Sequence, residues 1–237
     1  MTRALFAAMI ALLLPLPALA QSCPPPLASA KRLVVVTADT FTGTTATVQR
    51  FERAAPNAPW QLSGGPASGQ VGRNGIAWAY AFRAFARRGE PIKVEGDKRA
   101  PAGFFKVGRS FGFAASDRPG YMRITDGMTC IYDLSSPAYN TITTRDQIAS
   151  TVRGENMRRV PEYARGLLVE YPTDRKARAG SCIFIHLQVP GKNGTGGCVA
   201  LPEPQLEAVQ DHVQGGGAVL AILPRQGLDR FKGCLPQ

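Results

Sequence analysis

The sequence predicts a mainly β fold with a few short helices, arranged as a single domain. Short runs rich in Val, Ile and aromatic residues recur along the chain, and turn residues separate them, with 25 glycines and 19 prolines in 237 residues. Hydrophobic residues make up 44% of the chain and charged residues 19%, so the chain is able to bury a core of its own. No repeat, low-complexity tract or linker divides it. We therefore expect residues 21–237 to form one domain.

The first twenty residues predict a signal peptide. Arg3 supplies a basic start, an apolar run follows, and residues 18–20 (Ala-Leu-Ala) are a small-x-small cleavage site. The apolar run contains two prolines and is short for a membrane span of roughly 20 residues. A lipid anchor at Cys23 is disfavoured because the preceding residues are a poor lipoprotein cleavage pattern. We expect an exported protein, periplasmic or secreted, that begins at Gln21 and has no stable membrane insertion.

Several segments have the composition of strands. Residues 31–39 and 44–53 are β-branched runs on either side of a Thr-Gly turn and predict a β-hairpin. A Pro-Ala-Gly turn at 101–103 leads into a strand that extends to residue 114. Further strands are predicted in four segments, at residues 129–140, 165–172, 181–190 and 218–224.

Two segments predict helices. Residues 76–89, which end at a glycine, predict a short helix. Residues 202–217 have a clearer pattern, because Leu206, Val209 and Val213 recur at i, i+3 and i+7 between prolines at the start and glycines at the end. His212 lies near the end of this helix, where capping or compensation of the helix dipole explains it.

The chain has five cysteines, and an odd number leaves at least one thiol free if the others pair internally. Export permits disulfides. Spacing does not fix the pairing; our prediction is Cys130 with Cys182 and Cys23 with Cys234, the second pair tying the two ends of the chain together. Cys198 is the predicted free thiol, because it alone lies in a glycine-rich turn close to a histidine.

Residues 181–203 combine that cysteine with a histidine in a way that suits thiol chemistry. Strand alternation places Cys182, Phe184 and His186 on one face, and the glycine-rich loop before Cys198 allows backbone N–H groups to approach a ligand. Acyl transfer needs a thiolate, an imidazole that takes its proton, and donors that stabilise an oxyanion. From residue types alone, a core histidine beside a buried structural cysteine explains the segment equally well.

Metal and nucleic-acid functions are disfavoured. A zinc site made of Cys182, His186 and Cys198 lacks the paired close spacings of structural zinc sites, so we expect no metal and no cofactor. The formal charge of +11 falls to +10 once Arg3 is removed, and it is dispersed over two basic patches, residues 84–100 and 173–180. These patches are either solvated loops or a surface that attracts an anionic polymer of the cell envelope. No basic stretch is interleaved with base-stacking aromatic residues, so nucleic acid is not an expected partner.

Residues 184–201, FIHLQVPGKNGTGGCVAL, resemble the active-site motif of the L,D-transpeptidase catalytic domain family (YkuD-like), in which a histidine precedes a Ser/Thr-x-Gly-Cys turn. Residues 95–114 are similar to the family's Gly-Asp and Pro-x-Gly-x-Phe strand, and residues 130–140 to the segment before its active-site half. The resemblance covers about residues 90–225. It implies a β-sandwich or barrel-like catalytic domain, with an N-terminal β extension, that attacks peptidoglycan stem peptides.

The family's functional residues carry over to this sequence position by position. The resemblance implies attack after the L-centre of meso-diaminopimelate, release of D-alanine, and a thioester that passes to an amine or to water. The implied nucleophile is Cys198, the implied general base is His186, the backbone oxyanion donors are Gly197 and Cys198, and the candidate substrate contacts are Thr195, Gly196, Tyr139 and Asn140.

Three features depart from the family motif. Gly196 stands where a second histidine is usual, Ala200 stands where a basic or amide residue is common, and the interval from His186 to Cys198 is short. The departures affect substrate specificity and leave the cysteine and its base in place. Two alternatives therefore stay open: an L,D-carboxypeptidase or hydrolase of the same bond, and a non-catalytic envelope-binding module. We expect a monomer.

Overall fold

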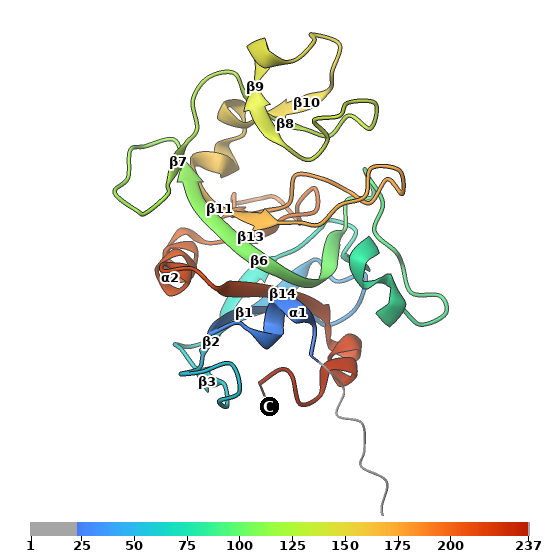
Figure 1. The fold of residues 1–237 in the computed structure, drawn as a ribbon, viewed down its shortest axis with the longest axis vertical. Helices are drawn as coiled ribbons and strands as arrows, with labels where there is room; N and C mark the ends of the chain where they lie inside the picture. The colour runs from blue at the N-terminus through green and yellow to red at the C-terminus, as the bar shows by residue number, and fades with distance from the viewer. Residues whose placement is uncertain (1–22, 237) are drawn as a thin grey trace, which may run out of the picture.

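The structure is a computed structural model, in which eight strands of one large sheet close into a barrel. The barrel lies at the centre of the molecule (Figure 1). The structure describes residues 23–236, so the predicted signal peptide lies outside the described residues. The barrel closes because β1 pairs with both β14 and β2. The fold is mainly β and barrel-like, as predicted. The order around the barrel is β1 (Arg32–Ala38), β14 (Ala218–Pro224), β6 (Ala100–Gly112), β11 (Arg165–Glu170), β12 (Phe184–Leu187), β13 (Val199–Leu201), β4 (Ala67–Gln70) and β2 (Thr45–Glu52).

Three short strands pair at the margins of the barrel: β3 (Gln61–Leu62), β5 (Ile76–Trp78) and β7 (Met122–Arg123). The predicted hairpin is confirmed, since β1 and β2 are antiparallel with Val36 opposite Val48. β6 begins at Ala100, so the Pro-Ala-Gly segment is part of the strand and not a turn before it. Gly103 is needed there, because a Cβ at its φ of +151° would lie 2.3 Å from a ring carbon of Phe82.

A second sheet of three strands stands above the barrel (Figure 1). Its order is β10 (Gly154–Asn156), β8 (Met128–Ile131) and β9 (Ile142–Thr144). Two 3₁₀ helices, η3 (Met157–Arg159) and η4 (Pro161–Ala164), lead from it back to β11. A small apolar cluster that includes Phe111, Tyr163, Phe184 and Cys198 fills the junction between this sheet and the barrel. Cys198 therefore lies where the two sheets meet.

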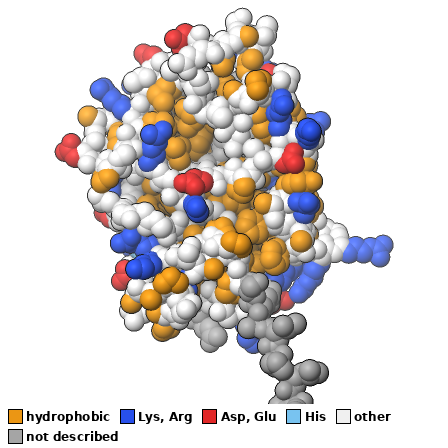
Figure 2. Space-filling view, viewed as in Figure 1, with side chains coloured by type: hydrophobic (Ala, Val, Ile, Leu, Met, Phe, Trp, Pro, Cys, Tyr) orange, Lys and Arg blue, Asp and Glu red, His pale blue; other side chains and the backbone are white. Residues whose placement is uncertain are grey.

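The helices are short, as predicted. Helix α1 (Pro25–Ala28) precedes β1, and helix α2 (Glu203–Val213) matches the predicted helix, with Leu206, Val209 and Val213 all buried. The remaining helical segments are 3₁₀ turns: η1 (Tyr80–Phe85), η2 (Arg145–Gln147) and η5 (Arg225–Phe231). In residues 23–236 no helix combines the length and apolar character that crossing a bilayer requires. Lys and Arg side chains are scattered over the face shown in Figure 2.

Residues 76–89 do not form the single short helix predicted for them. Ile76–Trp78 is strand β5, parallel to β6, and only Tyr80–Phe85 is helical. The indole of Trp78 is fully buried, and its Nε1–H donates to Glu90 Oε2 at 2.8 Å. Packing of this large ring against the core therefore outweighs the local helical pattern.

Both predicted disulfides are formed, and Cys198 is the free cysteine. Cys23–Cys234 joins the two ends of the described chain across a sequence separation of 211 residues. Cys130–Cys182 joins strand β8 of the small sheet to the segment just before β12. The second bond therefore fixes the small sheet to the strand that carries His186.

Candidate active site

Two neighbouring parallel strands carry the predicted nucleophile and base. β12 and β13 are parallel with His186 opposite Ala200, and this register, extended by one residue before the start of β13, places Cys198 opposite Phe184. Opposite residues point to the same face of a sheet, and so do residues two apart along a strand. Cys198 and His186 are therefore diagonal neighbours on one face. The sheet register brings them together despite the loop between them.

Cys198 is a buried thiol in the lining of a pocket. It is 6% exposed, and its Sγ donates to the backbone carbonyl of Cys182 at 3.5 Å. Burial raises the pKa of the Cys198 thiol to about 12, and this outweighs the backbone N–H of Phe184 and the hydroxyl of Tyr163, which both lower it. The thiol is therefore neutral at pH 7, and within residues 23–236 no hydrogen bond joins it to His186.

The backbone holds the imidazole of His186 in one orientation. Its Nδ1 lies 2.8 Å from the carbonyl oxygen of Leu187, and because a carbonyl only accepts, Nδ1 carries the proton and Nε2 keeps its lone pair. The ring of Tyr163 packs edge-on against it, with centroids 5.6 Å apart. Burial lowers the pKa of His186, so the imidazole is neutral at pH 7 and able to accept a proton. The imidazole is thus in the protonation state that a general base requires.

Thr195 stabilises the turn before Cys198. Its Oγ1 donates to the Cys198 carbonyl at 2.7 Å and accepts from the Gly197 N–H at 3.0 Å. Thr195 is 8% exposed and lines the pocket, and both hydrogen bonds of its hydroxyl serve the turn. The Gly197 N–H, predicted as an oxyanion donor, is thus already bonded to Thr195 and becomes available only if that hydroxyl turns away.

Gly196 and Ala200, the positions that depart from the family motif, have different surroundings. Gly196 is exposed, and a Cβ built there has no atom within 4 Å. Ala200 is 2% exposed and lies directly beside His186 in the parallel pair. The chain therefore has room for a side chain at Gly196, while Ala200 is enclosed beside the base.

Tyr139 and Asn140, predicted as substrate contacts, have structural partners and are absent from the lining of the pocket that holds Cys198. Tyr139 is 6% exposed, and its hydroxyl donates to Glu95 Oε2 at 2.6 Å. Asn140 Oδ1 accepts from the Cys182 N–H at 2.9 Å, and its Nδ2 donates to the Tyr171 carbonyl at 3.1 Å. Asn140 and Cys182 both have positive φ angles, +62° and +55°. These hydrogen bonds hold Asn140 and Cys182 in strained backbone conformations. The carbonyl of Cys182 is the one that accepts the hydrogen bond from the Cys198 thiol.

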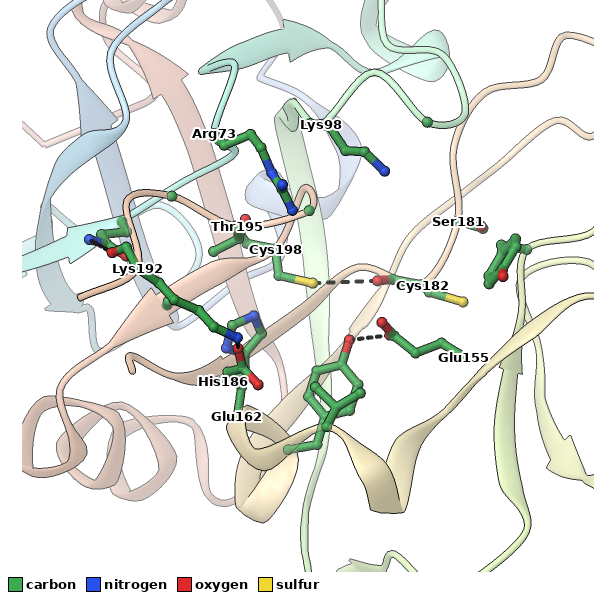
Figure 3. A pocket seen from close by; sticks show the side chains of 18 of the residues that line it. Arg73, Lys98, Glu155, Glu162, Ser181, Cys182, His186, Lys192, Thr195 and Cys198 are labelled. Atoms are coloured by element: carbon green, nitrogen blue, oxygen red, sulfur yellow. Dashed lines mark hydrogen bonds and ion pairs between the residues drawn. The ribbon is translucent and has the colours of Figure 1, made fainter. Parts of the chain in front are cut away.

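Cys198 and His186 open into one pocket of about 1000 Å³ (Figure 3). The small sheet with η4 forms one wall, and residues 188–197 and 95–98 contribute to the others. The zinc alternative does not fit, since Cys182 is disulfide-bonded. Basic side chains outnumber acidic ones in the lining, so the pocket favours an anionic ligand. The basic residues are Arg73, Lys98, Arg153, Arg159, Arg178 and Lys192, and the acidic ones are Glu95, Glu155 and Glu162.

Sequence reasoning missed two pocket residues in η4. Tyr163 is 5% exposed, contacts His186, and donates its hydroxyl to Glu155 Oε2 at 2.6 Å. Glu162 is 8% exposed and forms an ion pair with Lys192, whose loop lies across the pocket (Figure 3). The only sequence signal for them is a Glu-Tyr pair just before a strand, which is a weak one.

Comparisons with known proteins give distant likenesses. No protein-family model and no curated protein matches this chain. The chain is similar to a solved structure of the helical cell shape determining protein Pgp2 of Campylobacter jejuni, with 17% identity over 83% of this chain and 51% of that chain, at a TM-score of 0.40. It is also similar to Bd1075 of Bdellovibrio bacteriovorus, with 16% identity over 87% of this chain and 60% of that chain, at a TM-score of 0.40. The chain thus spans about half the length of Pgp2. A likeness at this TM-score assigns neither a family nor an activity to this chain.

Proposed function

We propose that this protein is an exported, cysteine-dependent L,D-transpeptidase that acts on peptidoglycan stem peptides. One observation carries the proposal: four of the five cysteines are in disulfides, and the fifth, Cys198, lies in a pocket beside a neutral imidazole. The resemblance of residues 184–201 to the L,D-transpeptidase motif supports the same choice. Two disulfides are consistent with export, and the basic lining suits a peptide that carries carboxylates.

In the proposed acylation, the thiol of Cys198 leaves the Cys182 carbonyl and turns toward His186. Nε2 of His186 accepts the thiol proton as the sulfur attacks the peptide carbonyl carbon. Backbone N–H groups at Gly197 and Cys198 stabilise the oxyanion. The Gly197 N–H becomes available for this role when the Thr195 hydroxyl turns away from it. The C–N bond then breaks, His186 returns the proton to the departing amine, and a thioester remains on Cys198.

The thioester has two fates. Attack by an amine of another stem peptide forms a cross-link, whereas attack by water gives a carboxypeptidase or hydrolase. Both outcomes use the same thiol and base, so the hydrolase is the nearer alternative. A non-catalytic envelope-binding module is the other alternative, and the raised pKa of the buried thiol is the observation in its favour.

Intact-mass measurement after incubation with muropeptides or a carbapenem tests the proposal. We expect a covalent adduct on the wild-type protein and none on Cys198→Ala, which keeps both disulfides and therefore serves as a matched control. No adduct on folded wild-type protein excludes the nucleophile assignment. Equal binding of muropeptides by the wild type and Cys198→Ala, with no adduct on either, favours the binding module.

A further inference from the structure

The carboxylate of Glu162 has one oxygen that is used and one that is not. Oε1 forms the ion pair with Nζ of Lys192, whereas Oε2 is buried and has no hydrogen-bond partner within the described residues. Burial alone would raise the pKa of Glu162, but the hydrogen bond from Lys192, helped by the Glu162 backbone N–H, leaves it below the ordinary value, so the group is charged at pH 7. A buried carboxylate oxygen without a donor is unfavourable and is rare in folded proteins. Glu162 therefore depends on the cation at Oε1 for its charge, and an ammonium group brought by a ligand suits that same position.

The other two acidic side chains in the pocket already have donors from the protein. Glu155 accepts from Tyr163, and Glu95 accepts from Tyr139 and Ser181, all at 2.6 Å. Those carboxylates are thus committed to the fold. Glu162 is the acidic group in the described pocket lining whose side-chain partner is an exposed cation, Lys192.

Lys192 is a partner that a ligand is able to replace. Its side chain is 59% exposed on the 188–197 loop, while the side chain of Glu162 is 11% exposed on η4. Because the Lys192 side chain is mostly exposed, its ammonium group is solvated when another cation takes its place at Glu162. Figure 3 shows the two side chains meeting beside the ring of His186. Displacement of Lys192 by another cation would place that cation next to the base.

We propose that Glu162 binds the ammonium group of the acyl acceptor, at the position that Nζ of Lys192 occupies, and so directs the thioester to an amine in preference to water. The inference rests on the proposed function, because an acceptor is needed only after a thioester has formed. It also agrees with the charge pattern. The many basic side chains suit an anionic acyl donor, and Glu162 supplies a separate acidic position for the cationic acceptor.

The transfer step balances in atoms and protons. The bound ammonium group loses one proton to Nε2 of His186, and its nitrogen then attacks the thioester carbon. The C–N bond forms, the C–S bond breaks, and the Cys198 thiolate takes the proton from His186. The new amide nitrogen releases a second proton, which His186 passes to solvent. An acceptor that arrives as R-NH₃⁺ thus ends as an amide, a thiol and one free proton.

A competition between two amines tests the role of Glu162. The donor is a stem tetrapeptide, and the acceptors are an acetylated lysine amide, which is cationic at neutral pH, and hydroxylamine, which is neutral. In Glu162→Gln we expect the ratio of lysine product to hydrolysis product to fall about tenfold or more, while the hydroxylamine ratio stays within about twofold. Acyl-enzyme formation, followed by intact mass, should fall by less than the lysine ratio falls, because the Glu162 charge also raises the pKa of the base His186. Glu203→Gln, an exposed change on α2, is the matched control and should alter none of these values.

The outcomes separate this inference from the proposed function. Failure of the wild type to form an acyl-enzyme overturns the function itself. If Glu162→Gln forms the acyl-enzyme and its ratio of lysine product to hydrolysis product is unchanged, only the acceptor site is overturned. An equal fall of the lysine and hydroxylamine ratios also overturns the acceptor site, because Glu162 would then act on His186 and not on the cationic acceptor. If Glu162→Gln does not fold, Lys192→Met replaces it: removal of the competing ammonium group should lower the KM for the lysine amide about threefold or more. An unchanged or raised KM overturns the inference.

Discussion

Two regions of the molecule each contain one disulfide and one buried histidine, and only one of them forms a pocket with a free thiol. In the terminal region, defined in sequence as residues 23–53 and 203–236 with Cys23–Cys234 and His212, burial lowers the pKa of the His212 imidazole. In the junction region, defined by Cys130–Cys182 and His186, burial also lowers the pKa of the imidazole. Burial and the direction of the pKa shift therefore do not distinguish a base from a packing residue.

The backbone carbonyls around each imidazole ring distinguish the two histidines. His212 Nε2 lies 3.1 Å from the Phe51 carbonyl, and the Leu33 carbonyl also favours its charged form, so backbone carbonyls surround the ring. His212 is thus held by β1 and β2, a role that replaces the predicted capping or dipole compensation. His186 has one carbonyl partner and lines the pocket beside Cys198.

The largest expected effect tests this contrast directly. His186→Ala should slow acylation of Cys198 by about 10²–10⁴-fold, because the thiol loses the group that accepts its proton. His212→Ala should leave acylation within about twofold and should lower the free energy of unfolding by about 2 kcal/mol, since a buried hydrogen-bonded ring is removed. Intact-mass time courses measure the first quantity and urea denaturation the second. Equal loss of acylation in both folded variants would remove the distinction between the regions.

A pH profile gives the next largest effect. Because burial raises the pKa of the Cys198 thiol to about 12, the thiolate fraction should increase tenfold for each pH unit between pH 7 and 9. Alkylation of the native protein should then accelerate about 100-fold over that range. In urea the same thiol is solvated, and its rate should level off near the ordinary pKa of about 8.5. A native rate that is flat from pH 6 to 9 would instead indicate a thiolate paired with a charged His186.

Sequence patterns within a few residues correctly predicted the elements whose conformation depends on neighbouring residues in the chain. The first hairpin follows from β-branched runs around a turn, and α2 follows from the spacing of Leu206, Val209 and Val213. The free Cys198 followed from an odd number of cysteines and a glycine-rich turn. Residues 76–89 were wrong as one helix because burial of Trp78 decides their conformation.

The pocket walls could not be predicted in the same way. Tyr139 and Asn140 belong to a segment similar to the transpeptidase family, yet their hydrogen bonds support Cys182 and Glu95. Glu162 enters the pocket only because η4 returns from the small sheet to β11. No periodicity or motif encodes that return, which depends on the packing of two sheets.

The smallest expected effects compare glycines of the two regions. Gly197 in the junction region has φ +143°, and a Cβ there would lie 3.0 Å from the Arg99 carbonyl oxygen. Gly233 in the terminal region has φ +86°, and a Cβ there would have no atom within 4 Å. Gly196 has the same open space around a Cβ and no positive φ. Gly197→Ala should therefore cost about 2–3 kcal/mol of unfolding free energy, Gly233→Ala about 1 kcal/mol, and Gly196→Ala less than about 0.5 kcal/mol. Urea denaturation measures all three. The difference between the first two combines the contact with Arg99 and the different φ angles. Equal costs at all three positions would show that the turn before Cys198 has no special conformational demand.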